Sequence, residues 1–257
     1  MAALEECQGR LDGAMRRNAG LATTLAVLVL AGGCATERAS SRGDVIRQIV
    51  PSTVQLRCER DGGGRRAASG VLLARDGATR RAWIVTTKHF LEPLVPQSVY
   101  VDAGRKGPVA ARLVTVSERS DLALLEVSGV DVPPARLKDL VRLGDDVWVV
   151  AFPFGRRMTL SSGVVSQVVP DAAGIEYEGS ARMVDVSVSY GASGGGVYDT
   201  QTGALVGLIQ SYRTARLAPR GGEAAIEVPV PGETTLVPAE AIRRFIVEAG
   251  LAAFLEP

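Results

Sequence analysis

The 257-residue sequence has very little histidine and cysteine: His89 is the only histidine, and there are three cysteines. A reaction that needs an imidazole base therefore has one candidate. The formal net charge is +1, and charges of both signs are scattered along the chain. This balance does not favour binding to nucleic acid. We expect no cofactor and no metal site.

The sequence also lacks an apolar run long enough to cross a bilayer comfortably. Its longest candidate, residues 21–30, follows the basic stretch Met15-Arg16-Arg17. A basic start followed by a short apolar run is typical of an export signal. Met15 is a better start than Met1, because the fourteen residues before it are mixed and acidic. We expect an exported protein of the periplasm or cell envelope.

The small residues that precede Cys34 make this segment resemble a lipoprotein signal, in which Cys34 becomes the lipidated first residue. Ala31 stands where leucine is usual, so ordinary cleavage near Ala35 remains an alternative. If Cys34 is lipidated and Cys7 is not translated, Cys58 is the only cysteine of the mature domain. An intramolecular disulfide is then excluded, so the fold must be stabilised by its hydrophobic core. A chain of this length can bury a core large enough for two small barrels.

The stretch most indicative of chemistry runs from Gly191 to Gly196, where Ser193 stands among glycines between two strand-like apolar runs. Glycine permits backbone angles that turn neighbouring amides toward one point, so the amides of Gly191 and Ser193 could hold an oxyanion. A hydroxyl beside such amides could attack a carbonyl. A flexible hairpin loop is the structural alternative for the same residues.

Two further residues complete a candidate triad. His89 follows Ala82–Thr87, a run of β-branched and aromatic residues that predicts a buried strand. Asp121 opens another strand-like segment, residues 121–127. Each could be structural on its own, the histidine at a barrel corner and the aspartate as a turn or cap residue. The three together point to nucleophilic catalysis.

Chain order distinguishes the folds that carry such a triad. The stretch around Ser193 also fits the G-x-S-x-G turn of α/β-hydrolases, but those enzymes place the histidine after the serine, and here none follows. Subtilisin-type order needs an aspartate before the histidine on an α/β scaffold. The order His89, Asp121, Ser193 is that of chymotrypsin-like proteases.

With these residues in view, the chain resembles a trypsin-like serine protease of the bacterial HtrA/Deg type. Ile84–His89 resembles the family's histidine strand, and Ser120–Leu125 its aspartate motif. The other matching stretches are Ser69–Leu73, Ala151–Gly155, Ser162–Ser166, Ser193–Gly195 and Leu205–Ile209. The sequence departs from the family at Lys88 and Phe90, which flank the histidine, and at Gly196, where proline is common.

The resemblance implies a serine endopeptidase that acts on protein or peptide substrates through His89, Asp121 and Ser193, with the amides of Gly191 and Ser193 as the oxyanion hole. By the family's layout, the base of the specificity pocket is Ser187, and its wall is Gln210-Ser211-Tyr212. Because Ser187 is not acidic, we expect a small or medium apolar residue before the cleaved bond. Two alternatives stay open: an inactive binding or scaffold protein with the protease fold, and an esterase-type acyl hydrolase with the same triad.

Short strands separated by frequent turns favour an all-β architecture of two antiparallel Greek-key barrels. A polar tether, residues 35–43, would lead into a short helix over Asp44–Val50 that is capped by Asp44. The chain would then form a first barrel over residues 44–130, a second over 131–235 and a closing amphipathic helix within 236–257. Fewer than fifty residues follow the last expected core strand, so we expect no PDZ domain.

The strands expected from the pattern fall into two groups. In the first half they are Thr53–Cys58, Gly70–Ala74, Ala82–Thr87, Ser98–Asp102, Ala110–Ser117 and Leu122–Val127. In the second half they are Asp146–Ala151, Ser162–Val169, Gly174–Glu178, Met183–Ser187, Gly196–Asp199 and Ala204–Ser211.

Overall fold

The structure is a computed structural model. It describes residues 41–60, 62–95, 97–104, 107–170, 174–217 and 226–255. The predicted export signal, Cys7 and Cys34 lie outside the described residues, as does most of the predicted tether. Among the helices within the described ranges, none has both the length and the apolar character needed to cross a membrane.

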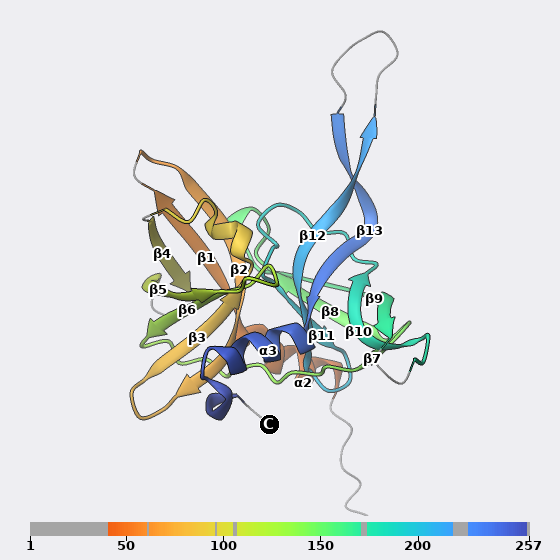
Figure 1. Cartoon of the computed structure of the whole chain (residues 1–257), viewed down its shortest axis with the longest axis horizontal. Coiled ribbons are helices and arrows are strands. Elements are labelled where there is room, and N and C mark those ends of the chain that lie inside the picture. Colours follow the sequence, from red (N-terminus) through yellow and green to blue (C-terminus); the bar gives the residue numbers. More distant parts are fainter. Residues whose placement is uncertain are drawn as a thin grey trace, which may run out of the picture. The chain divides into compact units, whose positions relative to one another are not determined.

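Six strands form the first barrel, in the closed order β1-β2-β3-β6-β5-β4 (Figure 1). All neighbouring pairs are antiparallel. Strand β3 is nearly all buried, as expected for its β-branched and aromatic residues. The strands are β1 (Thr53–Arg60), β2 (Arg65–Asp76), β3 (Arg81–Thr86), β4 (Gln97–Asp102), β5 (Val109–Val116) and β6 (Ala123–Ser128).

The second barrel has the strand order β13-β12-β11-β8-β9-β10, and a further pairing of β10 with β13 closes it. A two-residue strand, β7 (Val141–Arg142), pairs with the first two residues of β10. The expected all-β fold of two closed antiparallel barrels is therefore confirmed. The strands are β8 (Asp146–Ala151), β9 (Thr159–Pro170), β10 (Glu178–Val184), β11 (Gly196–Asp199), β12 (Leu205–Leu217) and β13 (Ile226–Pro238).

Two of the strands expected in the second half were wrong, and one strand was not expected. Residues 174–177 form a loop and turn, and residues 185–187 lie outside any strand. One strand, β10, replaces the two strands expected there, because Gly179 and Ser180 near its beginning do not interrupt the pairing with β9. Strand β13 was not expected, since its sequence contains three prolines and a glycine, residues that usually mark the end of a strand.

Two α-helices within the described residues pack against the barrels. Helix α2 (Arg42–Ile49) begins earlier than expected, because Ser41 rather than Asp44 is its N-cap. Asp44 instead accepts a hydrogen bond from the Ser41 amide at 3.0 Å and completes a capping box. After a short 3₁₀ turn, η1 (Val50–Ser52), the chain enters β1. Helix α3 (Ala239–Glu248) confirms the expected amphipathic C-terminal helix, and the short turn η4 (Ala252–Phe254) follows it.

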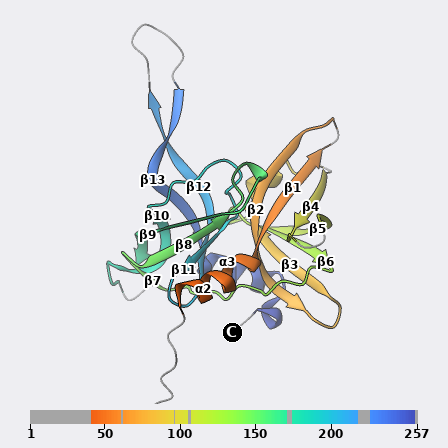
Figure 2. The same cartoon turned by 180° about the vertical axis from the view of Figure 1, so that it is seen from behind.

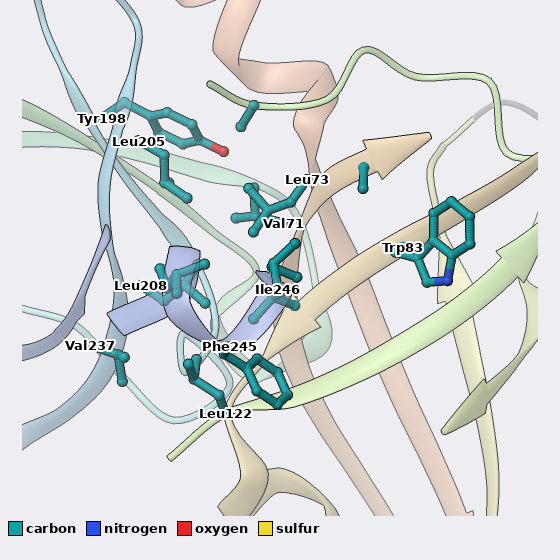
Figure 3. Packing of buried hydrophobic residues seen from close by; sticks show 14 of the residues in the cluster. Val71, Leu73, Trp83, Leu122, Tyr198, Leu205, Leu208, Val237, Phe245 and Ile246 are labelled. Carbon is teal, nitrogen blue, oxygen red and sulfur yellow. The ribbon is translucent and has the colours of Figure 1, made fainter. Parts of the chain in front are cut away.

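One hydrophobic cluster joins the two barrels to α3 (Figure 3). Val71 and Leu122 come from the first barrel, Leu208 from the second, and Phe245 and Ile246 from the helix, and all five are buried. Full burial of each such side chain stabilises the fold by about 1.5–3 kcal/mol. The shared core therefore fixes the loops of one barrel against those of the other.

Tyr198 gives a structural reason for Gly196. The phenol is fully buried, its hydroxyl lies 2.7 Å from Thr53 Oγ1, and burial raises its pKa. A side-chain carbon at position 196 would overlap the Tyr198 ring, with 2.5 Å to Cζ. Glycine at 196 therefore makes room for a tyrosine that links β11 to β1.

Candidate active site

Strand register brings His89 and Asp121 together. Strand β3 ends at Thr86, which is paired with Ala123 at the beginning of β6. His89 follows β3 in the short turn η2 (Lys88–Leu91), and Asp121 precedes β6. The two residues therefore extend from the same end of two adjacent strands.

The contact between them is direct. His89 Nδ1 lies 2.6 Å from Asp121 Oδ2, and the His89 amide donates to Asp121 Oδ1 at 2.9 Å. Burial alone raises the pKa of Asp121, but the hydrogen bonds from His89 outweigh it and leave the pKa below its usual value. The carboxylate is therefore ionised at neutral pH. Its side chain is 16% exposed and that of His89 is 40% exposed, so the imidazole is the member that a substrate can reach.

Ser193 lies on the second barrel, in the loop between β10 and β11. This loop, residues 185–195, is attached to the first barrel through the fully buried Ser69 of β2. The Ser69 amide donates to the carbonyl of Ser193 at 2.8 Å, and its hydroxyl donates to the carbonyl of Gly191 at 3.0 Å. The Ser69 carbonyl accepts from Thr86 Oγ1 at 2.7 Å. Through Thr86, at the end of β3, the serine loop is thus connected to the strand that precedes His89.

Sequence reasoning did not assign a role to Ser69 or Thr86. The only signal was the resemblance of Ser69-Gly70 to the family's glycine-led strand, which says nothing of a contact made more than a hundred residues later in the chain. Ser69 Oγ also accepts from the Phe152 amide at 2.9 Å. One small hydroxyl therefore connects three segments at the junction of the barrels.

The Ser193 hydroxyl is directed to a backbone acceptor. It donates to the carbonyl of Gln210 at 3.4 Å, and no hydrogen bond joins it to His89 among the residues that the structure describes. In the same described part of the chain, the amides of Gly191 and Ser193 have no protein acceptor. Gly191 has a φ of 88°, a conformation that favours glycine.

A cavity of about 470 Å³ lies beside the pair. His89, Asp121 and Gln210 line it from both barrels, together with Lys88 and Arg119. Lys88 Nζ donates to the carbonyl of Ser117 at 3.2 Å. Ser193 does not line this cavity, but its hydroxyl donates to the carbonyl of Gln210, one of the lining residues.

The four residues expected to form the specificity pocket are less tightly grouped. Ser187 is exposed, and within the described ranges no hydrogen bond links it to Gln210, Ser211 or Tyr212. Ser211 Oγ lies 2.7 Å from Thr235 Oγ1 of β13. The nearby Asp185 follows the end of β10 and accepts from the Val164 amide at 2.7 Å.

Two antiparallel barrels with a histidine–aspartate pair on the first and a glycine-flanked serine on the second define the trypsin-like peptidase class. The chain belongs to this family, because the model of the trypsin-like peptidase domain matches residues 68–208.

Relatives place the chain near one branch of that family. A probable periplasmic serine endoprotease, DegP-like, from Brucella suis is 31% identical over 191 residues, which cover 71% of this chain and 34% of the relative. The periplasmic pH-dependent serine endoprotease DegQ of Escherichia coli is 30% identical and covers 59% of this chain and 32% of its own length. The chain therefore spans about a third of the length of these relatives.

Solved structures agree on the fold. The HtrA-type protease AlgW with tripeptide has a TM-score of 0.61 at 21% identity, over 82% of this chain and 65% of that chain. The serine endoprotease from Yersinia pestis has a TM-score of 0.59 at 20% identity, over 83% of this chain and 67% of that chain.

Proposed function

We propose that the protein is a serine endopeptidase that hydrolyses peptide bonds in protein or peptide substrates through His89, Asp121 and Ser193. The observation that carries this proposal is the 2.6 Å contact between Asp121 and the chain's only histidine, at the junction where the Ser193 loop is attached. The DegP-like and DegQ relatives, named as periplasmic serine endoproteases, support the same activity.

In the proposed reaction, Ser193 Oγ attacks the carbonyl carbon of the scissile bond while His89 Nε2 takes the hydroxyl proton. Asp121 accepts the Nδ1 proton, which fixes the tautomer with a free Nε2 and stabilises the imidazolium. The tetrahedral intermediate then expels the amine, which receives the proton from His89, and an acyl-enzyme remains on Ser193. Water, deprotonated by His89, hydrolyses this ester and restores the serine.

The amides of Gly191 and Ser193 would stabilise the oxyanion of the tetrahedral intermediate. Ala192, between them, donates its amide to the carbonyl of Ser189 at 3.0 Å, and Gly194 donates to Ile209 at 2.8 Å. The amides of Ala192 and Gly194 thus stabilise the loop, and those of Gly191 and Ser193 are left to bind the oxyanion. Each donor of such a pair stabilises the transition state by about 3 kcal/mol.

The serine hydroxyl must turn from Gln210 to His89 for this reaction. Catalytic hydrogen bonds in proteases without substrate are often long and tighten only in the complex. The carbonyl of Gln210 is a weak competitor, because its 3.4 Å separation from Ser193 Oγ is beyond the usual range for a hydroxyl donor. Rotation of the Ser193 side chain toward His89 is therefore part of the proposal.

Substrate preference follows from the residues assigned to the pocket. With serine at 187 and no acid in its place, a preference for arginine or lysine is disfavoured. We propose a small or medium apolar residue before the cleaved bond, with Gln210, Ser211 and Tyr212 forming the wall.

A fluorophosphonate probe tests the proposal directly. We expect covalent labelling of the wild-type protein and complete loss of labelling in Ser193→Ala, because the probe reacts only with an activated serine hydroxyl. The readout is in-gel fluorescence, with equal amounts of folded protein confirmed by circular dichroism. Absence of labelling in the wild type would favour the inactive scaffold, and turnover of esters without turnover of peptides would favour the acyl hydrolase.

The N-terminal segment carries a separate proposal. We propose that residues 1–34 direct export to the periplasm, that Cys34 is lipidated, and that residues 35–43 tether the domain to the membrane surface. The relatives named as periplasmic support export.

Replacing the lipidated cysteine should release the protein. In cells that express the full chain, we expect Cys34→Ser to move it from the membrane fraction to the soluble fraction, because the acyl chains supply the membrane affinity. Cys58→Ser, a change at the buried free cysteine, is the matched control and should leave fractionation unchanged. Unchanged fractionation of Cys34→Ser, with no lipid on the mature N-terminus, would favour simple secretion.

A further inference from the structure

A single short helical turn carries His89. This turn, η2, spans Lys88–Leu91, and the residues on either side of it, Thr87 and Glu92, are extended. The backbone hydrogen bond that closes it, from the Glu92 amide to the His89 carbonyl, is 3.3 Å long. One turn of 3₁₀ helix has poor hydrogen-bond geometry and is not stable by itself. The position of His89 therefore depends on groups outside the turn.

On one side, these groups are Asp121 and the core of the first barrel. Asp121 accepts from the His89 amide and contacts the imidazole, and the side chains of Phe90 and Leu91 are buried in the core. The last carbonyls of a helical turn have no partner within it, so those of Leu91 and Glu92 need donors from elsewhere. Side chains of the first barrel supply these donors.

Two arginines on the hairpin of β1 and β2 donate to the end of the turn. Both views show these two strands side by side in the first barrel (Figures 1 and 2). Arg66 Nη1 donates to the carbonyl of Glu92 at 2.5 Å and to that of His89 at 3.3 Å. Arg60 Nη2 donates to the same Glu92 carbonyl at 2.5 Å. The two guanidinium groups thus converge on the end of the histidine turn.

Gln97 of β4 links Arg60 to the turn a second time. Its amide nitrogen donates to the carbonyl of Leu91 at 2.9 Å, and its oxygen accepts from Arg60 Nε at 3.1 Å. The same oxygen accepts from Cys58 Sγ at 2.7 Å. Burial raises the pKa of the Cys58 thiol, so the thiol is protonated at neutral pH and can donate. A partly buried hydrogen-bond network therefore holds Arg60 in place.

The charge around the two arginines supports the same role. Within the described residues, neither Arg60 nor Arg66 forms a salt bridge. Glu59, which precedes Arg60, pairs instead with Arg57 at 3.4 Å and with Arg65 at 3.6 Å. Hydrogen bonds from an ionised donor to a carbonyl are stronger than those from a neutral donor. Arg60 and Arg66 therefore direct their charge to the carbonyls of the turn.

We propose that Arg66, supported by Arg60, is a positioning residue for His89. Asp121 holds the ring and the amide of His89, and Arg66 holds its carbonyl. The main chain is thus fixed from both sides, which keeps Nε2 where it can take the Ser193 proton. Among the described residues, the Arg66 side chain donates only to this turn, so its loss should slow the chemical step and leave substrate binding unchanged. This inference rests on the proposed function, in which His89 is the base.

Three single variants test this role. Arg66→Met keeps the apolar stem and removes the donors, and we expect it to lower kcat about tenfold with KM within about twofold, because a displaced catalytic group reacts more slowly. Arg66→Lys restores a charged nitrogen. Since both contacts of Arg66 come from the one atom Nη1, this variant should recover most of the loss. Arg65→Met, at the neighbouring exposed arginine, is the matched control and should cleave like the wild type.

The measurements are kcat, KM and melting temperature, with rates expressed per folded protein so that lower stability does not count as lost catalysis. A loss of kcat in Arg66→Met that Arg66→Lys does not recover would overturn the positioning role. An equal loss in Arg65→Met would overturn it as well. A rise in KM without a change in kcat would also contradict it.

Nuclear magnetic resonance separates failure of this inference from failure of the proposed function. His89 is the only histidine, so untagged protein labelled with ¹⁵N-histidine gives ring signals from one residue. At a pH where the ring is neutral, we expect the wild type to keep its proton on Nδ1, with well-separated shifts for the two nitrogens.

In Arg66→Met, the ring should exchange between tautomers, and the two nitrogen shifts should approach each other. Arg65→Met should keep the wild-type shifts. Wild-type shifts in Arg66→Met would overturn the inference, whether or not the protein cleaves peptides. If the wild type cleaves no peptide and the shifts change as expected, the endopeptidase proposal fails and the positioning role is supported.

Discussion

Asp121→Asn is expected to lower kcat by roughly 10⁴-fold while leaving the fold and KM close to those of the wild type. Asparagine keeps the shape of aspartate but can offer Nδ1 of His89 a donor in place of an acceptor. The imidazole then takes the wrong tautomer, and no charge stabilises the imidazolium. The measurement is kcat, KM and melting temperature on one preparation.

The competing interpretation makes the opposite forecast. If Asp121 only caps the turn before β6, its loss should cost about 1 kcal/mol of stability and leave kcat near wild type. Asp131→Asn is a matched control, because it neutralises an exposed aspartate that pairs with Arg75 at 2.6 Å away from the site. We expect it to change kcat by less than about twofold, since an exposed ion pair contributes little. An early-melting Asp121→Asn variant with normal kcat would remove Asp121 from the triad.

The lowered pKa of Asp121 gives this comparison a pH dependence. A carboxyl whose pKa is lower in the folded state stabilises the fold at pH above its unfolded value, and this contribution disappears as pH falls through the folded value. Any melting-temperature advantage of the wild type over Asp121→Asn should therefore be largest at neutral pH. The difference should shrink in acid.

Gly194→Ala is expected to abolish fluorophosphonate labelling and to destabilise the fold by more than about 2 kcal/mol. Gly194 has a φ of 79°, which disfavours alanine. The added carbon would also overlap the Ser69 carbonyl and lie 2.5 Å from Thr86 Oγ1. Since Ser69 attaches the serine loop to the first barrel, the loop must move away, and a displacement of about 1 Å at a catalytic group can cost 10²-fold in rate.

Gly250→Ala separates the effect of the positive φ from the effect of the overlap with Ser69 and Thr86. Gly250 has a similar φ of 77°, but no atom lies within 4 Å of the added carbon. It should therefore show only the backbone cost, about 1 kcal/mol, with normal labelling. Thermal denaturation and probe labelling of both variants decide between the causes. If Gly194→Ala melted like Gly250→Ala and labelled normally, the contact with Ser69 would not control the position of Ser193.

Much of the architecture could be predicted from local pattern. A short run of β-branched and aromatic residues such as Ala82–Thr87 is typical of a buried strand. Both ends of β3 were therefore predicted to within one residue. Strand β13 could not be found this way, because Pro229, Pro231 and Gly232 are allowed only where an edge is unpaired or the partner strand tolerates a bulge. That condition belongs to the neighbouring strands and is absent from the segment itself.

The candidate site divides in the same manner. The sequence by itself determined which side chains could do the chemistry, since one histidine and the order His89, Asp121, Ser193 leave few alternatives. Only the tertiary structure decided that His89 contacts Asp121, through the register of β3 with β6, and that Ser69 holds the Ser193 loop. The chemistry of a side chain is a local property that the sequence states directly. Strand register and the packing of one barrel on the other depend on pairings between segments far apart in the chain, so they cannot be deduced from either segment alone.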